Sequence, residues 1–480
     1  MNKLYKGLGL VLMMAVVLSS CKKWLEVQPE DKVTELQVFS DLASASTALN
    51  GMYLQMTNAA LYGGNLSMTM IETLGQRYNI GVQHTQTQMQ NYQYGETNVK
   101  VSVENTWEAA FVVVVNANAF LRSLDVYAGS KIPARYDSIM RGEALALRAM
   151  MHFDMLRLFG PIYNTKDSLA KSIPYYRKAI PEVSELYPAN QVIDSVLADL
   201  KAAEQYLQRD PIISYGVEKF PQGDGLDFFR NRNMRMNYYA VKALQARVHL
   251  YRNDKAAAMA AAKAVVDGGG KWFPWVVPAR ILSDRINPDR VFSSELIMGL
   301  FNIKLYSANT TYFAPEVAEK DILAPNDTRL KAVFESNEND YRYTPLWIVP
   351  SAGGKTFRTF YKYTDVASKD SIFRYKQGLI RLSEMYYIMA ECEPDANAGR
   401  AWINTVRRNR GLTDLAATAS VNTELQKEYQ KEFWGEGQLF FYYKRRNVTT
   451  IPNSAATSGN VTMNATKYVV PLPLTETQYR

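Results

Sequence analysis

The sequence contains very little cysteine and histidine. Cys21 and Cys392 are the two cysteines in 480 residues, and the chain has three histidines. A glycine-rich phosphate loop, a G-x-S-x-G elbow and an H-E-x-x-H motif are also missing. Because zinc sites need clustered Cys, His and carboxylate ligands, we expect no metal site. We likewise expect no catalytic residue and no cofactor, so the sequence indicates a protein that is not an enzyme.

The few residues suited to metal binding or proton transfer are explained by ordinary structure. His152 and His249 lie inside predicted helices, where a structural role is the more common one, and His84 lies in a polar loop without acidic or cysteine neighbours. Cys392 is expected to be a small apolar residue of a helix. Four aspartates near glycine or proline fit either a calcium loop or simple turn chemistry: Asp224, Asp227, Asp284 and Asp289.

Concentrated positive charge and linker sequences are missing as well. The formal net charge is +8, and no run of Lys or Arg concentrates it, so nucleic acid is not an expected partner. No Ser/Gly-rich or Pro-rich stretch divides the chain. We therefore predict one continuous domain over residues 21–480.

The apolar run at the N-terminus is too short to span a membrane. Lys3 and Lys6 precede the run at 8–18, which has about half of the roughly 20 residues that spanning requires. Residues 1–20 therefore read as a signal peptide. The letters LSSC at 18–21 resemble a bacterial lipobox, in which the cysteine is acylated and becomes the new N-terminus. We predict lipidation at Cys21, which would hold the protein at a bilayer surface.

Helical periodicity recurs along the chain in paired segments. In RGEALALRAMMHFDMLRLFGP, apolar residues three and four apart share one face, and Gly160-Pro161 ends the helix. WEAAFVVVVNANAFLRSL, upstream, carries a similar stripe and is a plausible antiparallel partner. Its valine run could form a strand, but the flanking spacing favours a buried helix.

Two further pairs resemble tetratricopeptide repeats. NYYAVKALQARVHLYRND and KAAAMAAAKAVVDGGG meet at the turn Asn253-Asp254, and GLIRLSEMYYIMAECEPDANAGRAWINTVRRNRGL breaks at Glu393-Pro394. In the alanine-rich helix we expect the packed face to carry Ala256, Ala260 and Ala264. The fold class is thus mainly α, with tetratricopeptide-like helix pairs in an α/α superhelix and long irregular loops carrying small β elements.

The loops are the expected binding regions. Insertions at about 62–104, 209–233 and 271–370 are rich in Tyr, Asn, Gly, Pro and Thr, and loops of this length usually have a function. Aromatic rings can stack on the flat faces of sugars while polar groups hold the rim. The candidate ligand-binding residues are Tyr78, Tyr92, Trp272 and Trp275. The alternative for each ring is that it packs its loop onto the helices.

Five motifs together resemble the SusD/RagB family of nutrient-uptake lipoproteins. They are the acylated cysteine with WLEVQP and a helix ending in GMY, the GEALALRAMMHFDMLRLFG helix, RLSEMYYIMAE, NTVRRNRG and EFWGEGQLFFYYKR, and the chain closes on the similar VPLPLTE. In the fifth motif, Leu439 and Tyr442 replace an arginine and an aspartate that are usual in the family, which weakens an internal ion pair but not the fold.

The resemblance implies a lipid-anchored outer-membrane protein at the cell surface. It would capture an oligosaccharide or peptide ligand and act as a lid on a SusC-like TonB-dependent β-barrel transporter. Four tetratricopeptide-like helix pairs would form its scaffold, and the insertions would shape the ligand site.

Two other functions stay open from the residues alone. A periplasmic tetratricopeptide-like scaffold would bind only other proteins. A helical glycosidase would need two carboxylates about 5 to 10 Å apart across a cleft. Protease accessibility on intact cells distinguishes the scaffold from a surface binder, and release of reducing sugar distinguishes the enzyme.

The lipidation site generates the first prediction. Cys21→Ala should leave the protein soluble or uncleaved, because the acylated thiol is gone, and fractionation of cells with mass spectrometry of the N-terminus measures this. A Cys21→Ala protein that is still processed and recovered wholly with the membranes would contradict the prediction.

Overall fold

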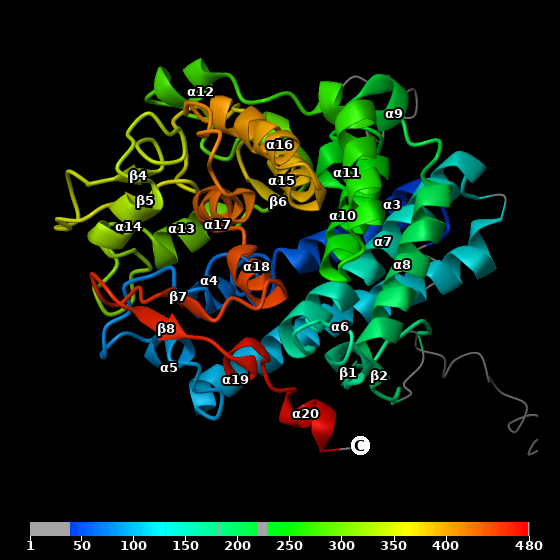
Figure 1. The fold of residues 1–480 in the computed structure, drawn as a ribbon. Coiled ribbons are helices and arrows are strands. Elements are labelled where there is room, and N and C mark those ends of the chain that lie inside the picture. The colour runs from blue at the N-terminus through cyan, green and yellow to red at the C-terminus, as the bar shows by residue number, and fades with distance from the viewer. Residues whose placement is uncertain (1–38, 130, 180–182, 218–227, 479) are drawn as a thin grey trace, which may run out of the picture.

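The computed structural model describes residues 39–129, 131–179, 183–217, 228–478 and 480. The predicted signal peptide at 1–20 and the predicted lipidation site Cys21 lie outside the described residues. Helices dominate the described chain and the strands are short, as Figure 1 shows. The predicted mainly α fold class is therefore confirmed.

Among the described residues, eight helices form four pairs in chain order, and the members of each pair contact one another. The pairs are α3 (Leu42–Met56) with α6 (Thr97–Ser123), α7 (Ala134–Phe159) with α8 (Ala189–Tyr206), α10 (Tyr238–Tyr251) with α11 (Lys255–Gly269), and α15 (Leu382–Cys392) with α16 (Ala396–Arg408). The expected contact of α6 with α7 is present, but α7 packs more extensively on α8. Neighbouring pairs meet through α8 with α10 and α11 with α15, which builds the predicted superhelix (Figure 1).

The other elements lie between the two helices of a pair, connect the pairs or follow the last one. The additional helices are α4 (Met70–Leu74), α5 (Thr87–Gln90), α9 (Ile212–Tyr215), α12 (Pro278–Leu282), α13 (Leu305–Tyr312), α14 (Asp327–Val333), α17 (Val421–Glu432), α18 (Leu439–Arg445), α19 (Ala465–Tyr468) and α20 (Leu474–Thr477). Single turns of 3₁₀ or π helix lie at Leu124–Ala128, Asp167–Leu169, Arg232–Met234, Gly270–Trp272 and Ser293–Glu295.

Each short strand pairs with one other strand to form a two-stranded antiparallel sheet. The pairs are β1 (Lys171–Ile173) with β2 (Tyr187–Pro188), β3 (Leu296–Phe301) with β6 (Lys376–Arg381), β4 (Trp347–Ile348) with β5 (Thr359–Phe360), and β7 (Thr450–Pro452) with β8 (Asn460–Thr462). In the β4–β5 hairpin, Trp347 lies opposite Phe360. These are the small β elements that the sequence predicts in the loops.

Helices α6 and α7 pack against each other within the scaffold. The valine run at 112–115 is helical, as expected, and α6 begins at Thr97, inside the segment assigned to the first loop. Residues Thr97–Ala128 are long and apolar enough to cross a membrane, but α6 contacts α3 and α7 and is a core helix of this fold. On α7 the predicted stripe is buried, with Met151 fully inaccessible, and the helix ends before Gly160.

The packed face of α11 differs from the expected one. Ala256, Ala260 and Ala264 are exposed, whereas Ala258 and Ala262 are buried. An almost uniform run of alanines gives no contrast between faces, so its periodicity could not identify the side that meets α10. The turn itself was predicted correctly: Asn253 has a φ of +66°, and the Asp254 carboxylate accepts a hydrogen bond from the Ala257 N–H at 3.1 Å.

His152 of α7 has the structural role that was expected. Its Nδ1 lies 2.9 Å from the Arg148 carbonyl oxygen, and its Nε2 accepts the Tyr176 N–H at 3.0 Å. The imidazole is therefore neutral, and burial lowers the pKa of His152 to about 3. His84 behaves in a similar way, since its Nε2 lies 3.1 Å from the carbonyl oxygen of Ile322.

The neutral His152 generates a pH prediction. The unfolded chain takes up a proton there below pH 6.5, whereas the folded chain does so only near pH 3. The contribution of His152 to stability is therefore complete above pH 6.5 and is lost as the pH falls toward 3. The free energy of unfolding, measured with urea between about pH 6 and pH 4, should fall more steeply in the wild type than in His152→Gln, by up to about 1.4 kcal/mol per pH unit. Parallel slopes would contradict this.

Candidate functional site

Carboxylates on the scaffold helices are held by buried cations. Glu143 lies 2.9 Å from Arg235, Arg148 lies 2.7 Å from Asp199, and Glu384 pairs with an arginine of α10 at 2.6 Å. These carboxylates are members of structural ion pairs. Among the described residues, no group of three or more His, Cys, Asp or Glu is arranged to hold a metal ion. A carboxylate already neutralised in this way is poorly placed for acid–base chemistry.

The largest ionic cluster surrounds Glu432 at the end of α17. Its Oε1 accepts from Arg381 and Arg410, each at 2.6 Å, and its Oε2 accepts from Arg342 at 2.9 Å. All four side chains are at most 1% exposed. Burial raises the pKa of Glu432, but the three guanidinium groups outweigh it and hold that pKa well below 4.5. The cluster joins α17 to β6, to the end of α16 and to the loop before β4.

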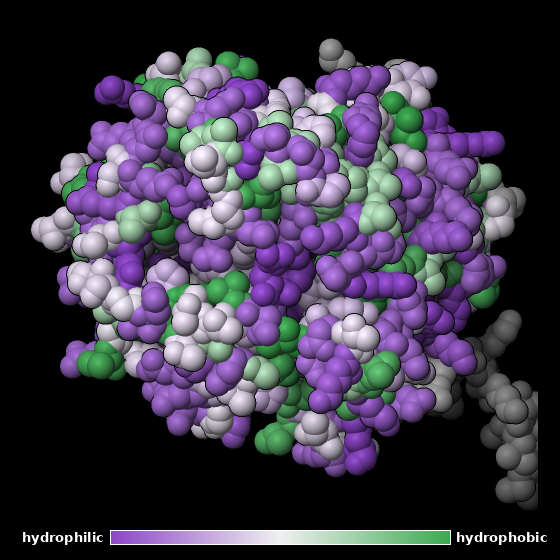
Figure 2. Space-filling model, viewed as in Figure 1, coloured by the Kyte–Doolittle hydropathy of each residue, from purple (hydrophilic) through white to green (hydrophobic). Residues whose placement is uncertain are grey.

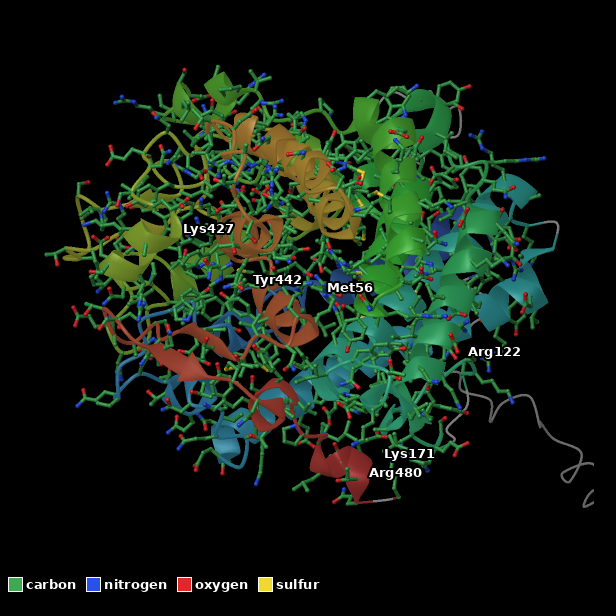
Figure 3. The ribbon with its side chains drawn as sticks, in the orientation of Figure 1. Met56, Arg122, Lys171, Lys427, Tyr442 and Arg480 are labelled. Carbon is green, nitrogen blue, oxygen red and sulfur yellow. The ribbon has the colours of Figure 1, made fainter. Side chains whose placement is uncertain are left out.

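The two departures from the family pattern in α18 are filled by apolar contacts. Tyr442, labelled in Figure 3, stacks on Tyr429 of α17 at 4.3 Å between ring centroids. Leu439 is 2% exposed. Next to them, Arg445 retains an ion pair with Glu391 at 2.6 Å. Stacking thus joins α17 to α18.

The four candidate ligand-binding aromatics occupy separate environments. Tyr78 is 0% exposed and donates its hydroxyl to the Met68 carbonyl at 2.6 Å. Tyr92 is 9% exposed and donates to the Leu74 carbonyl at 2.9 Å. In both cases the ring faces the protein and the polar tip is satisfied by main chain. Their geometry therefore favours the packing alternative.

Trp272 and Trp275 are half-buried against the scaffold. The Trp272 ring lies so close to Gly216 that a Cβ there would meet it at 2.6 Å. Trp275 contacts Tyr386 of α15 at 5.4 Å between ring centroids, and Arg410 lies 5.4 Å from its ring. Both rings keep some exposed surface, but they do not share a cavity with Tyr78 or Tyr92.

A chain of aromatic contacts leads from Tyr78 to the wall of a cavity. Tyr78 meets Phe313 at 6.3 Å, Phe313 meets Phe360 at 5.2 Å, and Phe360 stacks on Trp347 at 4.5 Å between centroids. Trp347 also contacts Trp434, two residues after Glu432, at 4.6 Å. Tyr78 therefore supports a cavity wall from behind.

The cavity opens between α12 and the β4–β5 hairpin and has a volume of about 520 Å³. This is within the roughly 300 to 1,000 Å³ of small-molecule sites. It is lined by Ile281, Leu282, Asp284, Arg285, Pro288, Arg290, Thr344, Pro345, Trp347, Ile348, Val349 and Arg358. All belong to the insertion predicted at 271–370. In Figure 2, apolar atoms lie among hydrophilic ones over α12, at the upper left. We call this hollow the α12 cavity.

The polar lining of the α12 cavity is mainly arginine. Arg290 donates from Nε to the Pro345 carbonyl at 3.1 Å, which fixes its guanidinium at the cavity. Burial lowers the pKa of Arg290 to about 10, so it stays protonated at neutral pH. Arg358 lies 3.3 Å from Asp327 and 5.2 Å from the Tyr343 ring. Asp284, the single acidic lining residue, accepts from the Asn287 N–H at 2.7 Å, as turn chemistry predicts.

Other hollows are less suited to a ligand. Two of them are lined by residues close in sequence to 180–182 or 218–227, which lie outside the described residues. A third lies on the scaffold, where Arg252 already pairs with Asp194 at 2.8 Å and Arg445 with Glu391. The α12 cavity combines apolar walls with cations that are not fully neutralised, and it is the best candidate site.

Two family models match most of the chain. Residues 23–217 match a SusD-like model described as starch-binding and associating with the outer membrane, and residues 297–471 match the SusD family model. The chain belongs to the SusD family. The resemblance seen in its motifs is thereby confirmed.

Individual SusD-like proteins are distant from this chain. SusD-like protein P2 of Formosa agariphila is 26% identical over 213 residues, which are 43% of this chain and only 38% of that protein. SusD-like protein P38 of the same organism is 24% identical over 432 residues, 80% of this chain and 76% of that protein.

Solved structures of the SusD superfamily share the fold over nearly the whole chain. A Bacteroides thetaiotaomicron protein has a TM-score of 0.70 at 19% identity, covering 91% of this chain and 98% of its own. A laminarin-binding SusD-like protein has a TM-score of 0.64 at 16% identity, covering 92% and 98%.

The cationic residues of the α12 cavity are not among the site residues predicted from the sequence. In the segment DRINPDR the aspartates were considered as calcium ligands, whereas Arg285 and Arg290 line the cavity. Arg358 is some 70 residues further along the chain and comes close through the β4–β5 hairpin. The sequence does contain a signal for these cationic residues: two arginines flank a proline-containing turn within a loop that was expected to bind the ligand.

The supporting role of Tyr78 generates a stability prediction. Tyr78→Ala should lower the free energy of unfolding by about 3 to 5 kcal/mol, as for other buried aromatic truncations. Tyr206→Ala, which truncates a ring that is 39% exposed, should cost about 0.5 kcal/mol or less. Urea unfolding measures both. A small effect at Tyr78, together with lost ligand affinity, would restore the ligand-contact hypothesis.

Proposed function

We propose that this SusD-family protein binds a glycan in the α12 cavity at the cell surface and delivers it to a TonB-dependent outer-membrane transporter. The observation that carries the proposal is the cavity itself, an apolar hollow with an arginine rim formed entirely by the insertion between the third and fourth helix pairs. Apolar walls suit the C–H faces of sugars, and donors at the rim suit their hydroxyls.

Family membership supports the glycan as ligand. One matching model is described as starch-binding, and one protein of the same fold is named for laminarin binding. The ion-paired carboxylates on the helices favour binding over hydrolysis, because a glycosidase needs a free acid and a free base or nucleophile across a cleft.

The membrane and transporter parts of the proposal rest on other features. Cys21 in its lipobox would anchor the chain, and the description of the matching family as associating with the outer membrane supports that location. The helix pairs form a broad scaffold on which a transporter could dock, leaving the loops to hold the ligand. Pull-down in mild detergent, from cells grown on the bound glycan, should recover a large β-barrel protein.

Binding in the cavity is tested with a pair of double variants. Leu282 and Val349 are 46% and 50% exposed at the cavity, so truncating them should not unfold the protein. In calorimetric titrations with a panel of oligosaccharides that includes laminarin, Leu282→Ala/Val349→Ala should bind roughly five- to thirtyfold more weakly, a loss of about 1 to 2 kcal/mol.

The matched control is Leu54→Ala/Val115→Ala, which removes the same side chains on α3 and α6 at exposures of 57% and 49%. It should bind like the wild type. Equal weakening in both double variants, or unchanged affinity at the cavity, would move the glycan site elsewhere. Release of reducing sugar by the purified protein would favour the glycosidase alternative.

A further inference from the structure

We propose that the saccharide bound in the α12 cavity is acidic, with a carboxylate or sulfate group held by Arg290 and Arg358. This inference rests on the proposed function and specifies the ligand class. Its basis is a charge imbalance in the lining, where Arg285, Arg290 and Arg358 face one carboxylate, that of Asp284. The Asp284 Oδ1 atom is engaged by the main-chain N–H groups of its own turn.

Arg290 differs from the buried arginines of the Glu432 cluster. Arg342, Arg381 and Arg410 are each paired with at least two carboxylates. Arg290 is half-buried, and its guanidinium lies 5.7 Å from the Tyr361 ring. Its one side-chain hydrogen bond is the Nε contact to a carbonyl, and no carboxylate lies within ion-pair distance of it in the part of the chain that the structure describes. Its terminal nitrogens are therefore available to a ligand.

A half-buried cation without a counterion is costly, because burial removes water that no anion replaces. The lowered pKa of Arg290 reflects this cost. For Arg342, Arg381 and Arg410 the same cost is offset by neighbouring Glu or Asp side chains. At Arg290 the cavity has room for a ligand that carries the anion.

Arg358 is a second cation of the cavity whose charge is only partly neutralised by its carboxylate partner. Its contact with Asp327 is 3.3 Å, longer than a usual charge-assisted hydrogen bond, and Asp327 is shared with Lys331 at 2.9 Å. A guanidinium binds carboxylate or sulfate oxygens through two parallel N–H bonds, which a neutral sugar hydroxyl cannot match. The cavity therefore favours an acidic sugar over its neutral counterpart.

The test compares acidic saccharides with neutral partners of the same backbone. Oligogalacturonates are titrated against their methyl esters, and sulfated carrageenan oligosaccharides against their desulfated forms. At least one acidic form should bind tenfold or more tightly than its neutral partner, and the preference should weaken with added salt. The series that shows the preference identifies carboxylate or sulfate as the recognised group.

Variants then assign the preference to the cavity. Arg290→Gln and Arg358→Gln should each weaken binding of the acidic form roughly ten- to hundredfold, and binding of the neutral form by less than about threefold. Arg408→Gln is the matched control, because Arg408 is exposed and pairs with Asp414 outside the cavity. If Arg290→Gln lowers the melting temperature, two other measurements test the cationic rim in a folded protein. They are acidic-saccharide binding by Arg285→Gln, at the exposed rim, and the salt dependence of binding by the wild type.

The two proposals fail in different ways. Equal affinity for acidic and neutral forms, lost together in Leu282→Ala/Val349→Ala, would overturn the acidic ligand and keep the glycan site. A preference for acid that survives Arg290→Gln and Arg358→Gln would overturn the assignment to these arginines. Failure of the wild type to bind any saccharide would overturn both proposals.

Discussion

The shared carboxylate of Glu432 is the interaction on which the arrangement of the C-terminal half depends. One side chain accepts from Arg342, Arg381 and Arg410, which come from a loop, a strand and a helix end far apart in sequence. Removing one member of a buried ion pair typically lowers the free energy of unfolding by about 3 to 5 kcal/mol, because its partner stays charged without water or a counterion. The cluster therefore fixes α17, β6 and the end of α16 relative to one another more strictly than apolar packing alone would, because guanidinium groups demand specific directions as well as contact.

Both walls of the α12 cavity rest on this cluster. On one side, Arg410 lies 4.6 Å from the ring of Phe292, and Phe292 belongs to the small apolar cluster that contains Ile281. On the other side, Trp434 follows Glu432 closely in sequence and contacts Trp347. The insertion has an apolar cluster of its own, and the ionic cluster adds a rigid support beneath it. This explains how an insertion with few regular elements can present a stable binding hollow.

The sequence predicts the scaffold well and the site poorly, for physical reasons. Helix α7 has apolar residues at helical spacing and a Gly-Pro stop, so its buried face follows from local pattern. In α11 the pattern fails at Ala258, because alanine occurs on every side. In the loops, burial depends on distant partners as well as near ones: Tyr78 packs against Phe313, more than 200 positions away, and composition alone made Tyr78 look like a ligand contact. The role of Arg290 likewise depends on an absent counterion, which no local motif encodes.

The most direct measurement is a crystal structure of the soluble chain, without residues 1–21, bound to the tightest saccharide of the titrations. The account predicts sugar density between α12 and the β4–β5 hairpin, with an anionic group within hydrogen-bonding distance of Arg290 and the Glu432 cluster unchanged. Sugar density at another surface, with the α12 cavity empty, would contradict it.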